Sequence, residues 1–330
     1  MAARTTFGIR LPNSGPFAAP TTIQRIAAES EALGFDVLWV HDHIAWKGER
    51  RTHFAAGSVE AVRDGPADFY ESIATVAFVA GMTARIKLGV AGLVLPFRDP
   101  RVLAKQLSTL HALSNRRLVP ALAIGRFEDE FAAQQVPYHQ RGRITDEYLA
   151  CLAAIFAPAQ VTSFAGAHVQ IGGAEYFPKP EGLPIWIGGM SDQALRRVVR
   201  YGAGWLPGGT VEEIEERWRT LARLLAESGR RADDLDRGLE VFTSIAESDE
   251  RACAIAAASL RHQAGTLERG LRQSLVGSTA TVVARMRRYV DAGITHFELK
   301  FVAHTPEMMV DMIRRYAGDV LPQFRQTDTR

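Results

Sequence analysis

The sequence predicts a (β/α)8 barrel, in which eight parallel strands are each followed by a helix. Strand-like and helix-like patterns alternate along the 330 residues, and eight strand–helix pairs can be counted in order. The main alternative, a doubly wound open sheet, should carry a glycine-rich dinucleotide turn after its first strand. That position reads PNSGPFAAP and contains no G-x-G-x-x-G. We therefore expect a single barrel domain spanning residues 1–330.

Each expected element has a local signal. The strands are expected at residues 6–11, 35–42, 86–95, 117–125, 184–189, 203–209, 238–246 and 295–302. The helices are expected at residues 20–34, 69–82, 100–113, 128–134, 143–156, 191–202, 211–228, from 249 onward, 278–293 and 306–324. Pro20 and Pro100 suit first helical positions, Gly34 a helix end and Ser278 an N-cap. Pro120 weakens the fourth strand.

Three segments interrupt the alternation and are predicted to be insertions. Residues 157–183 contain VTSFAGAHVQIGG, which suggests a small hairpin before strand five, followed by a proline-stiffened return. Residues 45–68 and 247–276 have no interpretable motif. Insertions on a barrel commonly shape the substrate pocket, and we expect that of all three.

Composition excludes several classes of function. Hydrophobic residues make up 47% and charged residues 23% of the chain, and the net charge is +2. There is no long Lys/Arg block, which argues against nucleic acid or an anionic membrane as a partner. The N-terminus has no apolar leader and no run is long enough to span a bilayer, so a cytoplasmic protein is expected. Cys151 and Cys253 lie in alanine-rich helical sequence and are expected to be packing residues.

If the fold is a barrel, its chemistry lies at the C-terminal strand ends. Strand two ends in His41-Asp42-His43, which allows three interpretations. The histidines could share a metal ion, could be satisfied partners at the start of a loop, or could handle protons beside an organic cofactor. A metal would lack further ligands, because strands five and six end in WIGG and WLPGG, and we expect none.

Two other strand ends suggest chemistry from their residue types alone. The stretch Gly188-Gly189-Met190-Ser191 precedes a helix, where free backbone N–H groups favour a phosphate, and Ser191 also suits an N-cap. Lys300 follows HFEL in the last strand, a position that a Schiff-base aldolase would use. Aldolase chemistry leaves the ends of strands two and three unexplained.

A family resemblance brings these ends together. The stretches FGIRLPNSGP, ALGFDVLWVHDHI, IKLGVAGLVLPFRDPRVLAKQLSTL, IGRFEDEF, RGRITDEYL, PKPEGLPIWIGG, ALRRVVRYGAGWLP and RYVDAGITHFELKFV occur in the expected order over nearly the whole chain. Together they resemble the luciferase-like monooxygenase superfamily of flavin- and deazaflavin-dependent oxidoreductases, and more narrowly its F420-dependent branch.

The resemblance implies roles for particular residues. Asp42 and His43 would contact the flavin or deazaflavin ring, with His41 replacing a small residue more usual there. Ala91-Gly92 would form a bulge with a non-prolyl cis peptide that supports the ring, where glycine lets a flat ring approach. Trp46, one residue closer than the family spacing, is a candidate substrate contact or a packing anchor.

The remaining assignments follow from the same resemblance. Gly125 and Arg126 would contact the cofactor, and Glu128 would act as an acid or stabilise the substrate, although it also suits a first helical turn. Gly188, Gly189, Met190 and Ser191 would hold the phosphate. Asn13 and Lys300 are candidate substrate contacts.

The sequence thus predicts an F420-dependent oxidoreductase that transfers a hydride between the deazaflavin and a small organic substrate, with His43, Asp42 and Glu128 as catalytic residues. The alternative is an FMNH2-dependent monooxygenase that uses O2 and a separate flavin reductase. A non-catalytic relative that binds a ligand without turnover is a third possibility. Family members are often homodimers, and the apolar helix faces of this chain permit one.

Overall fold

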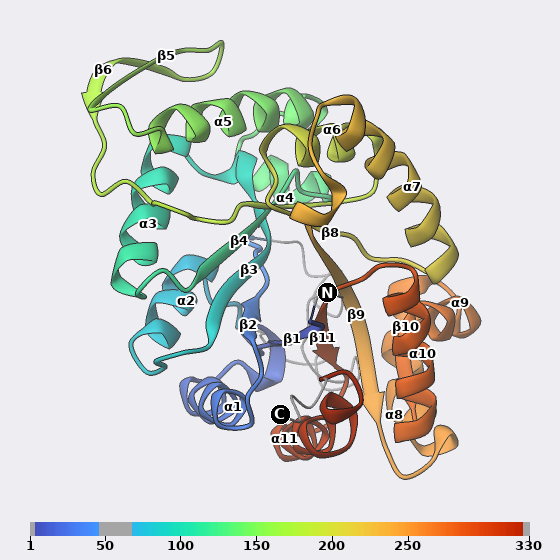
Figure 1. The fold of residues 1–330 in the computed structure, drawn as a ribbon. Helices are drawn as coiled ribbons and strands as arrows, with labels where there is room; N and C mark the ends of the chain where they lie inside the picture. Colours follow the sequence, from blue (N-terminus) through green and yellow to red (C-terminus); the bar gives the residue numbers. More distant parts are fainter. Residues whose placement is uncertain (1–3, 46–67, 326–330) are drawn as a thin grey trace, which may run out of the picture.

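Eight parallel strands close a barrel, as predicted (Figure 1). The computed structural model describes residues 4–45 and 68–325. The barrel strands are β1 (Thr6–Arg10), β2 (Val37–Val40), β3 (Lys87–Val94), β4 (Leu118–Ala123), β7 (Trp186–Gly188), β8 (Gly204–Leu206), β9 (Asp236–Ile245) and β11 (His296–Phe301). They pair in this order, and β11 returns to β1. The expected strands are therefore all present, with ends that are mostly shorter.

Helices surround this barrel on the outside (Figure 1). They are α1 (Pro20–Ala32), α2 (Ser72–Ala80), α3 (Pro100–Leu113), α4 (Glu128–Ala133), α5 (Arg141–Phe156), α6 (Asp192–Tyr201), α7 (Val211–Glu227), α8 (Asp249–Ala264), α9 (Leu267–Arg272), α10 (Thr279–Asp291) and α11 (Pro306–Arg315). The predicted caps are present, because Ser191 and Ser278 accept bonds from main-chain N–H groups at the starts of α6 and α10.

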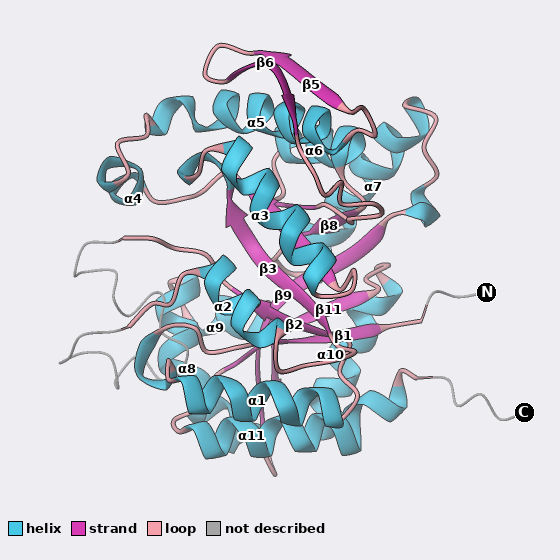
Figure 2. Ribbon diagram, turned by 90° about the vertical axis from the view of Figure 1, so that its left-hand side faces the viewer, coloured by secondary structure: helices cyan, strands magenta, loops and turns pink. Residues whose placement is uncertain are grey.

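Two of the three insertions lie within the described residues, whereas residues 46–67 of the third lie outside them. The predicted hairpin forms from β5 (Val161–Ala165) and β6 (Gln170–Glu175), and it lies against α5, far from α1 and α11 (Figure 2). The 247–276 segment contains α8 and also two elements that the sequence patterns did not predict, α9 and β10 (Ser274–Gly277). Strand β10 pairs with the C-terminal half of β9, beyond the two residues of β9 that pair with β8.

Large aromatic rings fill the interior of the barrel. Trp39 on β2 and Trp186 on β7 pack at 5.6 Å between ring centroids, and both contact His296 on β11. The Trp39 indole donates a hydrogen bond to Nε2 of His296 at 3.0 Å. Glycines at 8 and 89 leave the space that the Trp39 ring occupies. The barrel is therefore a packed core whose top, at the C-terminal strand ends, remains for a site.

Three smaller expectations also have an outcome. Pro120 does lie within β4, just before the two residues that pair with β7, where β4 lacks a partner on that side. Cys151 is buried, Cys253 is partly buried, and both are free thiols. In the two described ranges, no helix combines the length and apolar character that crossing a membrane requires.

Candidate active site

A cavity of about 620 Å³ opens at the C-terminal ends of the barrel strands, within the size range of cofactor and substrate sites. Most of the expected site residues line it. They are Asp42, His43, Ala91, Gly92, Gly125, Arg126, Gly188, Gly189, Met190 and Lys300. Ser259, Gln263 and Gln273 also line it, so the 247–276 insertion does shape the cavity as expected. The hairpin at 157–183 supplies no lining residue, contrary to our expectation.

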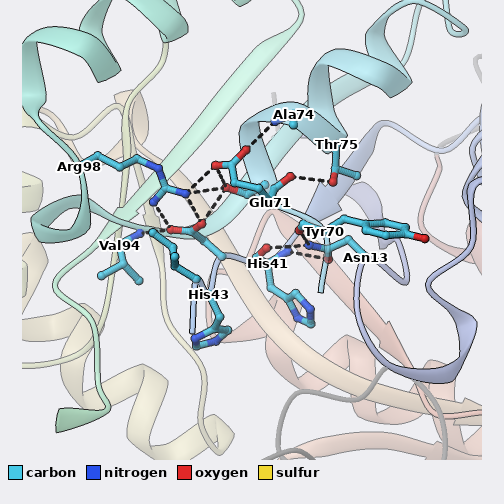
Figure 3. A network of polar contacts seen from close by, with 12 residues as sticks. Asn13, His41, His43, Tyr70, Glu71, Ala74, Thr75, Val94 and Arg98 are labelled. Atoms are coloured by element: carbon cyan, nitrogen blue, oxygen red, sulfur yellow. Dashed lines mark hydrogen bonds and ion pairs between the residues drawn. The ribbon is translucent and has the colours of Figure 1, made fainter. Parts of the chain in front are cut away.

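The three polar residues at the end of β2 point in two directions, toward the cavity and toward Arg98. His41 and His43 belong to the cavity wall, and their rings extend away from Arg98 (Figure 3). Asp42, between them, turns its carboxylate to the other side, because side chains alternate along an extended chain. There Arg98 donates two hydrogen bonds to it, at 2.6 and 2.7 Å.

The Asp42 carboxylate is held by several donors, which we call the Asp42 clamp. The carboxylate also accepts bonds from the Ser72 hydroxyl and the Val94 N–H, both at 2.8 Å, and Arg98 further pairs with Glu71 at 2.7 Å. The Asp42 side chain is 0% exposed. The expected catalytic role of Asp42 therefore does not fit its position. The residue ties the end of β2 to the start of α2 and the end of β3.

The carboxylate that pairs with His43 comes from α4. Nδ1 of His43 lies 2.9 and 3.1 Å from the two oxygens of Glu130, and one of these oxygens also accepts the Ile44 N–H at 3.0 Å. The Glu130 side chain is 1% exposed. A carboxylate only accepts, so Nδ1 carries the hydrogen and the lone pair of the neutral imidazole lies on Nε2. This is an imidazole–carboxylate couple suited to proton transfer.

Glu128 does not take the position that the sequence analysis gave it. It is exposed in the first turn of α4 and does not line the cavity. Two residues correspond to about 200° of rotation around a helix, so Glu128 and Glu130 cannot face the same side. The structure differs from the expectation in that Glu130, and not Glu128, is the carboxylate in contact with His43.

His41 is held as a neutral imidazole. Its Nε2 lies 2.7 Å from the Ser14 hydroxyl, its Nδ1 lies 3.4 Å from Nη1 of Arg10, and its ring stacks on Phe69 at 4.7 Å. Burial, followed by the positive charges of Arg10 and others, holds the pKa of His41 well below its usual value. No group of three or more His, Cys, Asp or Glu suited to a metal occurs among the described residues.

The end of β3 presents bare main chain to the cavity. The register between β3 and β4 shifts between Ala91 and Leu93, which is the expected bulge, and the Ala91–Gly92 peptide is cis as predicted. A Cβ added at Gly92 would lie 2.8 Å from Cβ of Ala123. A larger residue at position 92 would therefore need Ala123 or the main chain to shift.

The loop after β4 brings a glycine and an arginine to the cavity wall. Gly125 has φ +79°, and an added Cβ would meet the Phe131 ring at 2.7 Å. Arg126 follows it on the cavity wall, exposed and near the Phe127 ring.

The turn before α6 combines two glycines with a helix N-terminus. Gly189 has φ +106°, and its carbonyl accepts a bond from the Trp205 indole at 2.8 Å. Ser191 is the N-cap, as expected, because its side chain accepts the Ala194 N–H at 3.2 Å, but it does not line the cavity. Asp192 at the first helical position is offset by an ion pair with Arg217.

A row of charges crosses the base of the cavity. Lys300 pairs with Glu240, and Arg10 pairs with the fully buried Glu298. Burial lowers the pKa of Lys300, and the positive charges of Arg10 and Arg126 lower it further. Burial raises the pKa of Glu298 and lowers that of Arg10, and in both cases the partner charge opposes the shift.

The two remaining substrate candidates lie elsewhere. Asn13 is fully buried and absent from the cavity wall, and its amide NH2 donates to the main-chain oxygens of His41 and Tyr70 at 2.9 and 3.1 Å. It braces the ends of β1 and β2 and does not fit the role of a substrate contact. Trp46 lies outside the described residues.

A (β/α)8 barrel with a cavity at its C-terminal strand ends, glycine main chain in the wall and a histidine–glutamate couple defines a barrel enzyme. Residues 4–274 match the luciferase-like monooxygenase family. The chain belongs to this family, as the resemblance implied, and it is an enzyme.

Similar proteins agree with this assignment. An F420-dependent glucose-6-phosphate dehydrogenase of Amycolatopsis mediterranei is 22% identical over 336 residues, covering 93% of this chain and 95% of the relative. The F420-dependent tetrahydromethanopterin reductase of Methanopyrus kandleri superposes with a TM-score of 0.78 and 18% identity, over 98% of this chain and 100% of that one. A monooxygenase of Streptomyces bottropensis gives 0.80 and 18%, over 97% and 99%. The two structural likenesses show the shared fold.

Proposed function

We propose that the protein is an F420-dependent oxidoreductase that transfers a hydride between C5 of the deazaflavin and a small organic substrate. The observation that carries this proposal is the His43–Glu130 couple in the same cavity as the bare main chain of Ala91–Gly92. The His43–Glu130 couple can carry a proton, and the Ala91–Gly92 main chain leaves room for a flat ring. The F420-dependent dehydrogenase that covers 93% of this chain supports the same cofactor.

The residues present fit a flat ring with a phosphate arm. Gly92 leaves no Cβ between the main chain of the bulge and a ring. The main chain at 188–191 precedes the N-terminus of α6, where a phosphate is favoured and the charge of Asp192 is already offset by Arg217. Arg126 supplies a positive charge on the cavity wall for an anionic group. When bound, the deazaflavin would supply the hydride chemistry.

The residues of this chain would orient the His43 ring and transfer the proton of the substrate. Glu130 orients the His43 ring through its contact with Nδ1. His43 can take a proton from a substrate hydroxyl at Nε2, or return one to a carbonyl oxygen. The Phe69 and Phe127 rings lie 5.5 and 5.9 Å from the His43 ring and exclude water from this side of it.

A binding titration tests the cofactor. The purified protein is titrated with F420 and, separately, with reduced FMN, and binding is followed through the absorbance and fluorescence of each cofactor. We expect saturable binding of F420. Tight binding of reduced FMN with no uptake of F420 would overturn the proposal in favour of the monooxygenase, whose fold this chain shares.

Replacing His43 tests turnover. In an F420-dependent enzyme, His43→Ala should lower kcat by about 10²- to 10⁴-fold, the usual contribution of general acid–base catalysis. His139→Ala is the control, because His139 is exposed and lies outside the cavity wall. A protein that only binds the cofactor would lose affinity in His43→Ala with no turnover to lose.

A further inference from the structure

A buried arginine at the cavity wall has no role assigned so far. Arg10 ends β1, and its side chain is 9% exposed. Glu298, on the neighbouring strand β11, has a side chain that is 0% exposed and forms an ion pair with it. Isolated charges this deep are costly, so each depends on the other.

The guanidinium reaches three other barrel strands from this position. Nη2 donates to the Ala91 carbonyl of the β3 bulge at 3.0 Å, and Nη1 lies 3.4 Å from Nδ1 of His41 at the end of β2. Nη2 also lies 3.9 Å from Glu240 on β9, which is itself paired with Lys300. Arg10 thus contacts both features on which the proposed cofactor site depends, the bulge and the end of β2.

Chemistry fixes the proton of His41. Arginine is always protonated and can only donate, so Nδ1 of His41 must accept from Arg10. The hydrogen of the neutral ring is then on Nε2, which donates to the Ser14 hydroxyl at 2.7 Å. A lysine could not replace this arrangement, because one ammonium lacks the planar fork that reaches two acceptors in fixed directions.

We infer that Arg10 is a positioning residue, which with Glu298 as its counter-charge holds the Ala91 carbonyl and the His41 ring in the geometry that receives the cofactor. The inference rests on the proposed function for its consequence. Arg10 reaches the cavity wall, and in this inference it acts through the main chain and the imidazole that it contacts.

The test separates positioning from folding. In the double variant Arg10→Met/Glu298→Met both charges are removed together, a change that buried ion pairs often tolerate without loss of stability. We expect a folded protein whose Kd for F420 rises at least tenfold. Arg10→Lys should act in the same direction. The control is Arg117→Lys, because Arg117 donates to several main-chain carbonyls before β4, away from the cavity wall.

A second readout does not need the cofactor. The ¹⁵N chemical shifts of the His41 ring in the free protein should show the hydrogen on Nε2 in the wild type and in Arg117→Lys. The double variant should show a mixture of the two tautomers or the hydrogen on Nδ1. Unchanged affinity and an unchanged tautomer in the folded double variant would overturn the inference.

The two proposals fail in different ways. If the wild type binds neither F420 nor reduced FMN, the proposed function is overturned. The tautomer of His41 then decides whether Arg10 orients the ring.

Discussion

Two glutamates of α4, two residues apart, show how helix geometry separates a residue that contacts His43 from one at the surface. Glu130 is buried against His43, and Glu128 is exposed two residues earlier. The sequence places acidic residues at positions 128, 129 and 130, and all suit a helix N-terminus equally well. Only the direction of the helix selects the one that reaches the histidine, and this direction depends on tertiary packing.

This pair offers a matched comparison. Glu130→Gln keeps the size of the side chain but replaces the carboxylate that accepts from His43 Nδ1 and orients its ring, so kcat should fall by roughly 10- to 100-fold. Glu128→Gln should leave kcat unchanged. Steady-state kinetics at several pH values measure both. Equal effects of the two variants would contradict the assignment of Glu130.

Replacing Gly92 should weaken cofactor binding. In Gly92→Ala the new methyl group would approach Cβ of Ala123 at 2.8 Å and would thicken the surface offered to a ring. Cofactor affinity should fall at least tenfold, as measured by titration. Gly172→Ala on the hairpin has nothing within 4 Å and should bind as the wild type does. Wild-type affinity in Gly92→Ala would show that the ring lies elsewhere.

At the scale of elements, the Asp42 clamp joins β2, α2 and the end of β3. It explains why two histidines project into the cavity while the aspartate between them does not. A buried carboxylate with three kinds of donor leaves its arginine poorly compensated when it is removed. Arg98 would keep only the half-exposed Glu71.

Asp42→Asn should therefore cost about 3 kcal/mol of unfolding free energy, the lower end of what breaking a buried pair costs. Glu227→Gln is the control, because Glu227 pairs with Arg223 on the exposed face of α7 and such pairs contribute at most about 1 kcal/mol. Denaturant unfolding measures both. A cost below 1 kcal/mol for Asp42→Asn would contradict the clamp.

The elements that the sequence predicted have strong local signals. Pro100 and Ser278 start helices at the expected residues, and the buried strands are continuous apolar runs. Helix α9 was missed because its six residues include Gly270, which disfavours a helix, and β10 because its four residues follow directly without a turn signal. Gly92 and Gly125 were assigned to the cavity wall through the family resemblance, whereas Gly188 and Gly189 were also indicated by their place before a helix.

The residues missed in the site are mostly charges inside the barrel. Arg10, Glu240 and Glu298 come from three strands, and their contacts are visible only when the barrel closes. One signal was available. Glu298 and Lys300 are two residues apart on a strand and so share a face, which indicates a polar interior at that level.

At the scale of the whole molecule, burying histidines without charge makes stability depend on pH. Burial, with a smaller contribution from Lys87, lowers the pKa of His296 to about 3. Its Nε2 accepts from the Trp39 indole, so protonation there would break that bond. The buried interior of the barrel therefore tolerates only the neutral ring.

The sign follows from the depressed pKa. The unfolded chain takes up a proton near pH 6.5, and the folded chain does so only near pH 3. The contribution is complete above about pH 6.5. Below it, the unfolding free energy should fall by about 1.4 kcal/mol per pH unit for this one group. The lowered pKa of His41 acts in the same direction.

Comparison with His296→Gln isolates this effect, because other titrating groups contribute equally to both proteins. The slope of unfolding free energy against pH, measured by urea unfolding between pH 7 and pH 5, should be smaller by about one proton in the variant. Parallel slopes would show that His296 is protonated in the folded protein or titrates normally.

The crystal structure of the protein with bound F420 tests the central claim most directly. We expect the tricyclic ring in the cavity at the C-terminal strand ends, with one face on the Ala91–Gly92 main chain and the His43 ring in van der Waals or hydrogen-bond contact. A ring bound away from both Gly92 and His43, or a cavity that excludes the cofactor, would contradict it.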